Sequence, residues 1–362
     1  MVRIKLQIFF SIIFILLLLT GCEKNLTGIL YSPEYKIACI PKGIGDLYLF
    51  DTGRINQRLL VEGLVYQLDW SPNEPKLIYS IIPDPSVYHA NLFVFNLQNN
   101  QKKLLANEEG FKNNPIFSPD GKSILYFNTN FTTGESELTL MNADGLDKKV
   151  IYSKFYGEPI DGYYWSDIPD HLVFSQSDPS ATVGNLYLFD IQTKSKQFII
   201  SSEFSGYGFQ TVDGNNFYYH FYDQVNKIHA INRINLEEQT EYRVLTVSLP
   251  DWIENNFSVN PDGSKIVLPI NQFGQNYWFR DLYQVNADGS NLEKLTESTG
   301  INDFYDYPYY VPDGSQIIFI HSTASGREMC GLDPADGEIT HITEGNPFTG
   351  GSYLFKISPF KL

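Results

Sequence analysis

Histidine residues are the groups of this chain best suited to metal chemistry. His89, His220 and His321 stand at or just beyond the ends of short apolar runs, in widely separated parts of the sequence. Imidazole nitrogens are common ligands of divalent metals, and three of them converging on one channel would form a site. Alternatively, they are surface groups or hydrogen-bonded strand ends. We expect no bound metal or other cofactor, and if a metal is present we expect these three ligands.

No catalytic motif accompanies the histidines. The sequence contains no Gly-x-Ser-x-Gly elbow, no His-Glu-x-x-His pair, no Cys-x-x-Cys pair and no glycine-rich phosphate loop. Its Asp-Gly pairs lack the alternating carboxylates of a complete calcium loop and are better explained as turns. We therefore expect no catalytic residue, and a protein that acts by binding rather than by catalysis.

The start of the chain has the features of a secretion signal. Arg3 and Lys5 precede an apolar run over residues 6–19, which is too short to cross a bilayer as a helix, because about 20 residues are needed. The run ends in Leu19-Thr20-Gly21-Cys22, which resembles the lipobox of bacterial lipoproteins. That resemblance implies removal of residues 1–21 and a lipid on Cys22 as the membrane anchor. An ordinary signal peptide and a buried N-terminal helix are the alternatives.

The charge of the chain excludes one class of partner. Without Arg3 and Lys5, the 26 basic residues fall to 24 against 42 acidic ones, and 24 − 42 gives a net charge near −18. DNA and RNA binding needs basic residues against the phosphates, so we expect no nucleic-acid partner. Anionic lipid headgroups are not attracted either, and the lipid itself must hold the protein at the membrane.

A repeated turn organises the rest of the sequence. Its clearest copy is Ser118-Pro119-Asp120-Gly121, in which proline presets φ, aspartate bonds its own backbone and glycine accepts a positive φ. Other copies contain Pro72, Pro261 and Pro312, and degenerate copies contain Pro33, Asp167, Val212 and Pro359. Successive copies are 39 to 51 residues apart. A period of this size is typical of propellers and solenoids, and eight turns bound seven units.

A second repeat gives the same number of units. Each unit has a short strand that ends with an acidic or amide residue, and a basic-then-apolar strand follows most of them. The copies are DLYLFD at 46–51, NLFVFN at 91–96, ELTLMN at 137–142, NLYLFD at 185–190, KIHAIN at 227–232, DLYQVN at 281–286 and EMCGLD at 328–333. These seven copies agree with the number of turns.

Each unit divides into four strands, here called A to D. Strand A enters the turn, as at residues 66–70, and strand B leaves it, as at residues 124–127. Uninterrupted apolar B strands are typical of sheets buried on both faces, and no segment has a sustained helical period. The turn and the strand after it resemble the TolB-like β-propeller repeat over residues 32–362. The resemblance implies an all-β, seven-bladed β-propeller of four-stranded blades in one domain.

Closure of the ring needs one strand from outside the first unit. Residues 353–357 are suited to be this extra strand A, and residues 29–31 are the competing choice. We expect the C-terminal strand to join the N-terminal blade, because this hides both sheet edges and leaves residues 22–31 as a tether to the lipid. Cys39 and Cys330 then fall in neighbouring blades. A disulfide is possible there, but we expect two buried thiols.

Aromatic residues mark one end of the expected ring. The D–A and B–C connections of a propeller crowd the same end, and several D–A segments of this chain combine aromatic and acidic residues. Tyrosine and tryptophan often anchor interfaces. The candidate binding residues in these segments are Tyr156, Trp252, Phe304, Tyr305 and Tyr307. The alternative is that their rings pack the loops against the blades.

Together these features predict a lipid-anchored protein of the bacterial cell envelope, at the outer membrane, in the periplasm or at the cell surface. We expect a non-catalytic binding or scaffolding propeller whose protein or glycan partner contacts the D–A end. The alternative is a glycan-active enzyme such as a metal-dependent polysaccharide lyase, because oligogalacturonate lyases resemble this propeller class.

Overall fold

The computed structural model describes residues 34–155, 162–166, 168–177, 184–202, 204–212, 215–223, 225–254, 256–274, 277–343 and 354–362. The chain divides into two compact units, Met1–Glu34 and Tyr35–Leu362, and Cys22 lies outside the described residues. All described regular structure is β-strand, which confirms the all-β prediction. Among the residues described, no helix is long and apolar enough to cross a membrane.

The first sheet joins two of the repeating units in the order β28-β1-β2-β3-β4-β5-β6. Its strands are β28 (Leu354–Ile357), β1 (Lys36–Ile40), β2 (Gly45–Asp51), β3 (Arg54–Trp70), β4 (Lys76–Ile82), β5 (Asn91–Asn96) and β6 (Gln101–Ala106). The long strand β3 provides strand D of the first unit and strand A of the second, where the sequence predicts two separate strands. Gly63 stands between these halves with a φ of 135°, and the register shifts on both sides of it. Glycine allows this bend because it has no Cβ.

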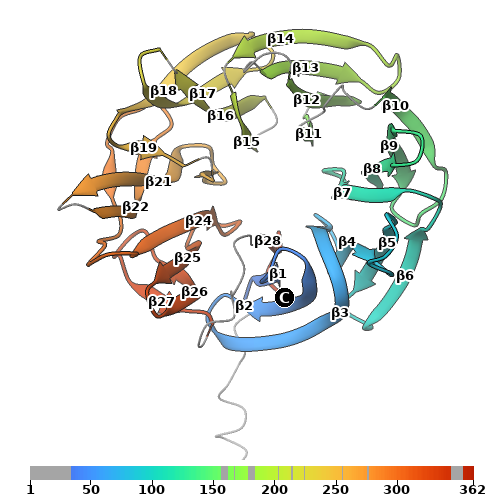
Figure 1. Ribbon diagram of the computed structural model, residues 1–362, viewed down its shortest axis with the longest axis horizontal. Helices are drawn as coiled ribbons and strands as arrows, with labels where there is room; N and C mark the ends of the chain where they lie inside the picture. The colour runs from blue at the N-terminus through green and yellow to red at the C-terminus, as the bar shows by residue number, and fades with distance from the viewer. Residues whose placement is uncertain are drawn as a thin grey trace, which may run out of the picture. The chain divides into compact units, whose positions relative to one another are not determined.

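Three four-stranded sheets follow, and Figure 1 shows the successive sheets around a common centre. In each of them, strands A to D pair in that order, as predicted. The first contains β7 (Phe111–Phe117), β8 (Ser123–Asn130), β9 (Glu135–Asn142) and β10 (Lys149–Phe155). The second contains β11 (Gly162–Trp165), β12 (His171–Ser177), β13 (Gly184–Asp190) and β14 (Lys196–Ser202). The third contains β15 (Phe204–Val212), β16 (Asn216–Asp223), β17 (Ile228–Asn235) and β18 (Thr240–Ser248).

The last sheet again joins two units. The first of these consists of β19 (Trp252–Ile253), β20 (Ser258–Val259), β21 (Lys265–Gly274), β22 (Tyr277–Asn286) and β23 (Glu293–Lys294). The second consists of β24 (Phe304–Tyr310), β25 (Ile317–Thr323), β26 (Gly326–Leu332) and β27 (Ile339–His341). A single parallel pairing, Arg280 with Phe304, connects β22 to β24 and so links the two units.

The repeated turn has the geometry that its residues predict. The Gly121 N–H donates to the Ser118 carbonyl over 2.8 Å, and Gly121 has a φ of 69°. The Asp120 carboxylate accepts from the Ser118 hydroxyl at 2.7 Å and from the Lys122 N–H at 3.0 Å. The turn therefore satisfies its own polar groups before strand B begins.

Apolar clusters fill the spaces between successive sheets. On β12, Leu172 and Phe174 belong to a cluster shared with β8, whereas Val173 belongs to a cluster shared with β16. Adjacent residues of a strand point to opposite faces. The continuous apolar run of this B strand is therefore buried on both sides, as predicted.

The C-terminal strand lies beside the N-terminal one. β28 pairs antiparallel with β1, and the Trp70 indole N–H donates to the Lys356 carbonyl over 2.9 Å. One apolar cluster contains residues of β1, β2, β25, β26 and β28, so strands from the two ends of the domain share a core. Cys39 and Cys330 are both free and buried, as expected. The alternative closing segment, residues 29–31, lies outside the described residues.

Candidate functional site

The B–C hairpin and the D–A connection lie at the same edge of each sheet, because neighbouring strands run antiparallel. We call this edge the B–C end. Large apolar side chains are exposed there on several sheets. They are Ile44, Val87, Tyr88, Phe131, Val225, Leu249, Phe273, Trp278 and Ile301. Contiguous exposed apolar groups are a common feature of interaction surfaces, and at this end Tyr88 contacts Phe131 and Phe273 contacts Trp278.

Two tryptophans form the centre of one aromatic group at this end. Trp252 starts β19, directly after a D–A connection, and Trp278 belongs to a B–C hairpin, yet their ring centroids are 4.4 Å apart at 63°. Phe273, on the other side of that hairpin, has its centroid 4.7 Å from that of Trp278. Trp278 is 38% exposed and Phe273 is 48% exposed. We call these three residues the Trp252 cluster. Their contact confirms that the two kinds of connection meet in this unit.

Strand register explains why these residues meet. Trp252 on β19 pairs with Asn271 on β21, Asn271 pairs with Arg280 on β22, and Arg280 pairs with Phe304 on β24. Four side chains that are far apart in the sequence therefore lie in one row across four strands. Two of the four, Trp252 and Phe304, are predicted binding residues.

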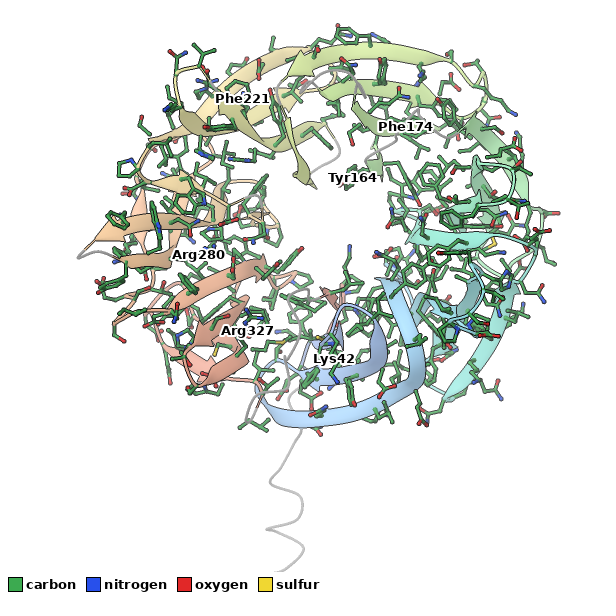
Figure 2. All side chains as sticks on the ribbon, viewed as in Figure 1. Lys42, Tyr164, Phe174, Phe221, Arg280 and Arg327 are labelled. Atoms are coloured by element: carbon green, nitrogen blue, oxygen red, sulfur yellow. The ribbon has the colours of Figure 1, made fainter. Side chains whose placement is uncertain are left out.

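Arg280, which Figure 2 labels, is the charged residue of this row. Its guanidinium donates to Glu254 at 2.6 Å, to Asn271 at 2.9 Å and to Asp306, and it lies 5.4 Å from the centroid of the Phe304 ring. Only 17% of the Arg280 side chain is exposed. A planar guanidinium with several fixed donors suits this site, because it pairs two carboxylates and one ring at once.

The neighbours of Arg280 are themselves held in place. Glu254 also accepts from the Trp252 indole at 3.2 Å and from the Asn271 amide at 2.8 Å. Burial raises the pKa of Asp306, and the Arg280 charge opposes that rise. The network fixes the base of the Trp252 cluster and leaves its outer rings in solvent.

A second aromatic group lies at the B–C end of other sheets. Tyr88, 79% exposed, has its ring centroid 5.2 Å from that of Phe131 on the next sheet. Phe131 contacts Phe111, and Phe111 contacts Tyr66, with centroid separations of 5.9 and 4.8 Å. This row runs from solvent into a buried strand, so the exposed rings have a rigid base.

The remaining predicted aromatic residues differ in their positions. Tyr156 lies outside the described residues. Tyr305 is only 8% exposed and stacks on His321 with centroids 4.4 Å apart. Tyr307 is partly buried against an apolar cluster. The alternative interpretation, that such rings pack the loop base, therefore describes the placement of Tyr305 and Tyr307.

The three predicted histidines have different partners. His89 Nε2 is 2.8 Å from the Asn91 side-chain oxygen, and His321 Nε2 is 2.8 Å from Asp303. His220 Nε2 is 3.0 Å from Nδ1 of His229. Within the described part of the chain, the one group of metal-ligating atoms that lie within 4.8 Å of one another contains none of the three.

His220 is buried near the B–C end of its sheet. Burial, and then the neighbouring His229, lower the pKa of His220 to about 3. Burial also lowers the pKa of His229, and the Glu254 charge opposes this. The pair is therefore neutral at physiological pH and acts as a hydrogen-bonded unit.

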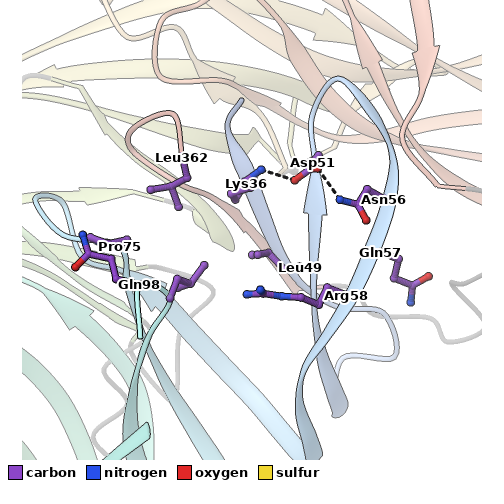
Figure 3. Close-up of a pocket in the computed structure, with 10 residues that line it drawn as sticks. Lys36, Leu49, Asp51, Asn56, Gln57, Arg58, Pro75, Gln98 and Leu362 are labelled. Atoms are coloured by element: carbon purple, nitrogen blue, oxygen red, sulfur yellow. Dashed lines mark hydrogen bonds and ion pairs between the residues drawn. The ribbon is translucent and has the colours of Figure 1, made fainter. Parts of the chain in front are cut away.

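A pocket of about 490 Å³ opens at the opposite edge of the first sheet (Figure 3). Its walls combine apolar side chains with polar ones, and its residues are Lys36, Leu49, Asp51, Asn56, Gln57, Arg58, Pro75, Leu97, Gln98 and Leu362. Lys36 pairs with Asp51 at 2.5 Å, and Asn56 donates to Asp51 at 2.8 Å. These groups satisfy one another and stabilise the start of β1.

Sequence reasoning missed several residues of the B–C end. Phe273 and Trp278 belong to a B–C hairpin, whereas the candidate binding residues named from the sequence are in D–A segments. Arg280 has no local motif, since the two carboxylates that it pairs with, Glu254 and Asp306, each lie 26 residues away. Aromatic residues on both sides of a turn near Gly274 are the one signal that could have identified the hairpin.

Comparison with solved structures shows similarity to β-propellers. The chain is similar to TolB from Acinetobacter baumannii, with 14% identity over 89% of this chain and 81% of that chain and a TM-score of 0.51. It is similar to an oligogalacturonate lyase in complex with manganese, with 16% identity over 84% and 85% and a TM-score of 0.56. It is also similar to a prolyl endopeptidase, with 10% identity over 87% of this chain and 51% of that chain and a TM-score of 0.64.

No family model matches the chain, and no curated protein matches its sequence. At these identities, the similarity of this chain to solved structures shows its fold alone. The chain has the fold of a TolB-like β-propeller.

Proposed function

We propose that this chain is a non-catalytic binding propeller whose partner is a protein that contacts the B–C end. It belongs to the bacterial cell envelope, and a lipid on Cys22 anchors it to the membrane. The ring has seven blades and is closed by β28 against β1. The observation that supports the binding role best is the group of exposed apolar side chains at one end of the sheets.

The chemistry of that end favours a protein over a glycan. Sugars stack on aromatic faces, but Ile44, Val87 and Val225 are aliphatic and exposed, and they offer no ring. A protein interface uses both kinds of side chain, with aromatic anchors surrounded by apolar and polar contacts. The Trp252 cluster and the Tyr88–Phe131 pair provide such anchors on rigid strands.

Two independent patterns support the proposed ring. The sequence contains eight copies of the turn and seven copies of the acidic strand, and apolar clusters join each described sheet to the next. The cluster shared by β1, β25 and β28 joins the last unit to the first. Pairing of β28 with β1 covers the edges that an open sheet would expose.

The proposal is tested by site-specific photocrosslinking in the native bacterium. A photoreactive phenylalanine replaces Tyr88, Phe131 or Trp278 at the B–C end, and Phe198 or Leu292 serves as the control position elsewhere on the surface. We expect one discrete adduct from the B–C positions only.

With the purified partner, Trp278→Ala and Phe273→Ala should each weaken the binding free energy by about 2 kcal/mol, or about a 30-fold rise in Kd.

Equal adducts from both sets of positions, or a Kd unchanged in both alanine variants, would contradict the proposal. A panel of purified envelope glycans gives a second readout. Saturable glycan binding that Trp278→Ala abolishes, without a protein adduct, would replace the protein partner with a glycan. Depolymerisation of an acidic polysaccharide by the purified protein would show catalysis and reject the non-catalytic role.

A further inference from the structure

Side chains that can bind a metal ion form a row across the outer strands of the last unit. Cross-strand pairing places His321 on β25 opposite Glu328 on β26, and Cys330 on β26 opposite His341 on β27. Glu328 and Cys330 are two residues apart on one strand, so they point to the same face. One carboxylate, one thiol and two imidazoles are therefore neighbours on that face.

The atoms of this row are close enough to share an ion. His341 Nδ1 lies 3.0 Å from a Glu328 carboxylate oxygen and 3.9 Å from the Cys330 sulfur. The three ligand atoms of Glu328, Cys330 and His341 all lie within 4.8 Å of one another. In a tetrahedral zinc site with bonds of about 2.0–2.3 Å, two ligand atoms are about 3.3–3.8 Å apart. The observed separations lie on both sides of that value, so small side-chain movements would bring the three to coordination distance.

A second imidazole, that of His321, is oriented toward the same carboxylate. His321 Nδ1 lies 3.5 Å from the other Glu328 oxygen, while its Nε2 is 2.8 Å from Asp303. The Thr299 N–H and hydroxyl both donate to Asp303, and Tyr305 stacks on the His321 ring. A carboxylate that holds the far nitrogen of a histidine is the usual outer partner of a metal-binding imidazole.

We propose that Glu328, Cys330 and His341 form a Zn²⁺ site, and that His321, which Asp303 positions and which lies outside the 4.8 Å group, moves toward the ion as the fourth ligand. The set of one sulfur, two nitrogens and one oxygen suits Zn²⁺ and does not suit Mg²⁺ or Ca²⁺, which prefer oxygen. On binding, the Cys330 thiol loses its proton to the solvent and coordinates as thiolate. The ion would tie the short strand β27 to β25 and β26.

This site is separate from the proposed partner surface. Failure of the binding role would leave it untouched, because none of its ligands belongs to the Trp252 cluster or to the exposed apolar groups of the B–C end. His321 is the one residue that this site shares with the three histidines predicted from the sequence, and its neighbours here come from its own sheet.

The test uses the purified full chain in detergent, stripped of metal by a chelator and titrated with Zn²⁺ or Co²⁺. We expect one equivalent of Zn²⁺ to bind and to raise the unfolding temperature. We expect Co²⁺ to give a thiolate-to-cobalt charge-transfer band. Because His341 is 59% exposed, His341→Gln should fold normally. It should lower the Zn²⁺ affinity at least tenfold, and Asp303→Asn should lower it by about tenfold.

Cys330→Ser provides the ligand-specific readout. It should remove the charge-transfer band, whereas Cys39→Ser and His171→Gln should retain both the band and the affinity. Absence of the band in the unaltered chain, or its persistence in Cys330→Ser, would overturn the proposal. So would an unchanged Zn²⁺ affinity in His341→Gln, which does not depend on substituting a buried residue.

Discussion

The Arg280 guanidinium donates to the Asp306 carboxylate and thereby joins β22 to β24, two strands of different units. Glu254 holds the opposite side of the same guanidinium. Between these units the described ladder contains a single parallel pairing, Arg280 with Phe304. Side-chain chemistry therefore supplements a short backbone contact at this junction, next to the Trp252 cluster.

Arg280→Met should destabilise the protein. The substitution leaves two largely buried carboxylates facing each other without a cation, and loss of one partner from a buried ion pair costs about 3 kcal/mol. Urea unfolding of the variant should show this loss. Arg280→Lys should recover part of the lost stability, because lysine restores the positive charge but not the planar set of N–H donors. An Arg280→Met variant as stable as the parent would show that the network does not stabilise the fold.

The fold could be predicted because its signals are local. Ser118, Pro119, Asp120 and Gly121 determine a turn from four adjacent residues, and a continuous apolar run determines a strand buried on both faces. Because this turn and strand repeat along the chain, the order of the sheets can also be predicted. Strand β3 is the exception, since the bend at Gly63 lets one strand serve two units and no local signal distinguishes this from two strands.

The site was less predictable because strand register brings its parts together. Phe304 and Tyr305 were expected together in a loop, but they lie at the start of β24, where adjacent side chains point to opposite faces. Phe304 therefore reaches Arg280, whereas Tyr305 packs against His321. In the same way, Glu254, Arg280 and Asp306 meet only after four strands have paired.

Stability should fall as the pH drops below about 6.5, and His220 should contribute to this fall. Burial and His229 lower the pKa of His220 to about 3 in the folded state, against about 6.5 in the unfolded state. Between these pH values the unfolded chain binds a proton that the folded chain does not. The free energy of unfolding therefore falls by up to about 1.4 kcal/mol for each pH unit of acidification. Above that range both states are neutral and the contribution vanishes.

Urea unfolding between pH 7 and pH 5 measures this effect. The slope of stability against pH should be shallower in His220→Gln than in the parent, whatever the stability of the variant at pH 7. His220→Asn, which also removes the titrating imidazole, should show the same shallower slope. Identical slopes for the parent and His220→Gln would show that His220 titrates equally in both states.

Phe355→Ala should be among the most destabilising single changes in the chain. Phe355 is 4% exposed and lies on β28, inside the cluster that β1, β2 and β25 share. Truncating a buried phenylalanine costs about 3–5 kcal/mol, and here the cavity would open where the last unit meets the first. Thermal unfolding should show a large loss. Lys356→Ala, on the same strand and 44% exposed, should change stability little, because its backbone still accepts from Trp70.

The Cys22→Ala variant should release the protein from the membrane. The sequence 19–22 resembles a lipobox, and the acidic domain offers no electrostatic attraction to anionic headgroups. The acyl chains would therefore supply the membrane affinity, at about 0.8 kcal/mol for each buried CH₂ group. Labelled fatty acid should enter the parent but not Cys22→Ala, and the variant should move to the soluble fraction after secretion.

A Ser358→Ala variant, altered at the far end of the chain, should stay lipidated and membrane-bound. If Cys22→Ala stays in the membrane while the parent incorporates no label, then residues 1–21 act as something other than a lipoprotein signal.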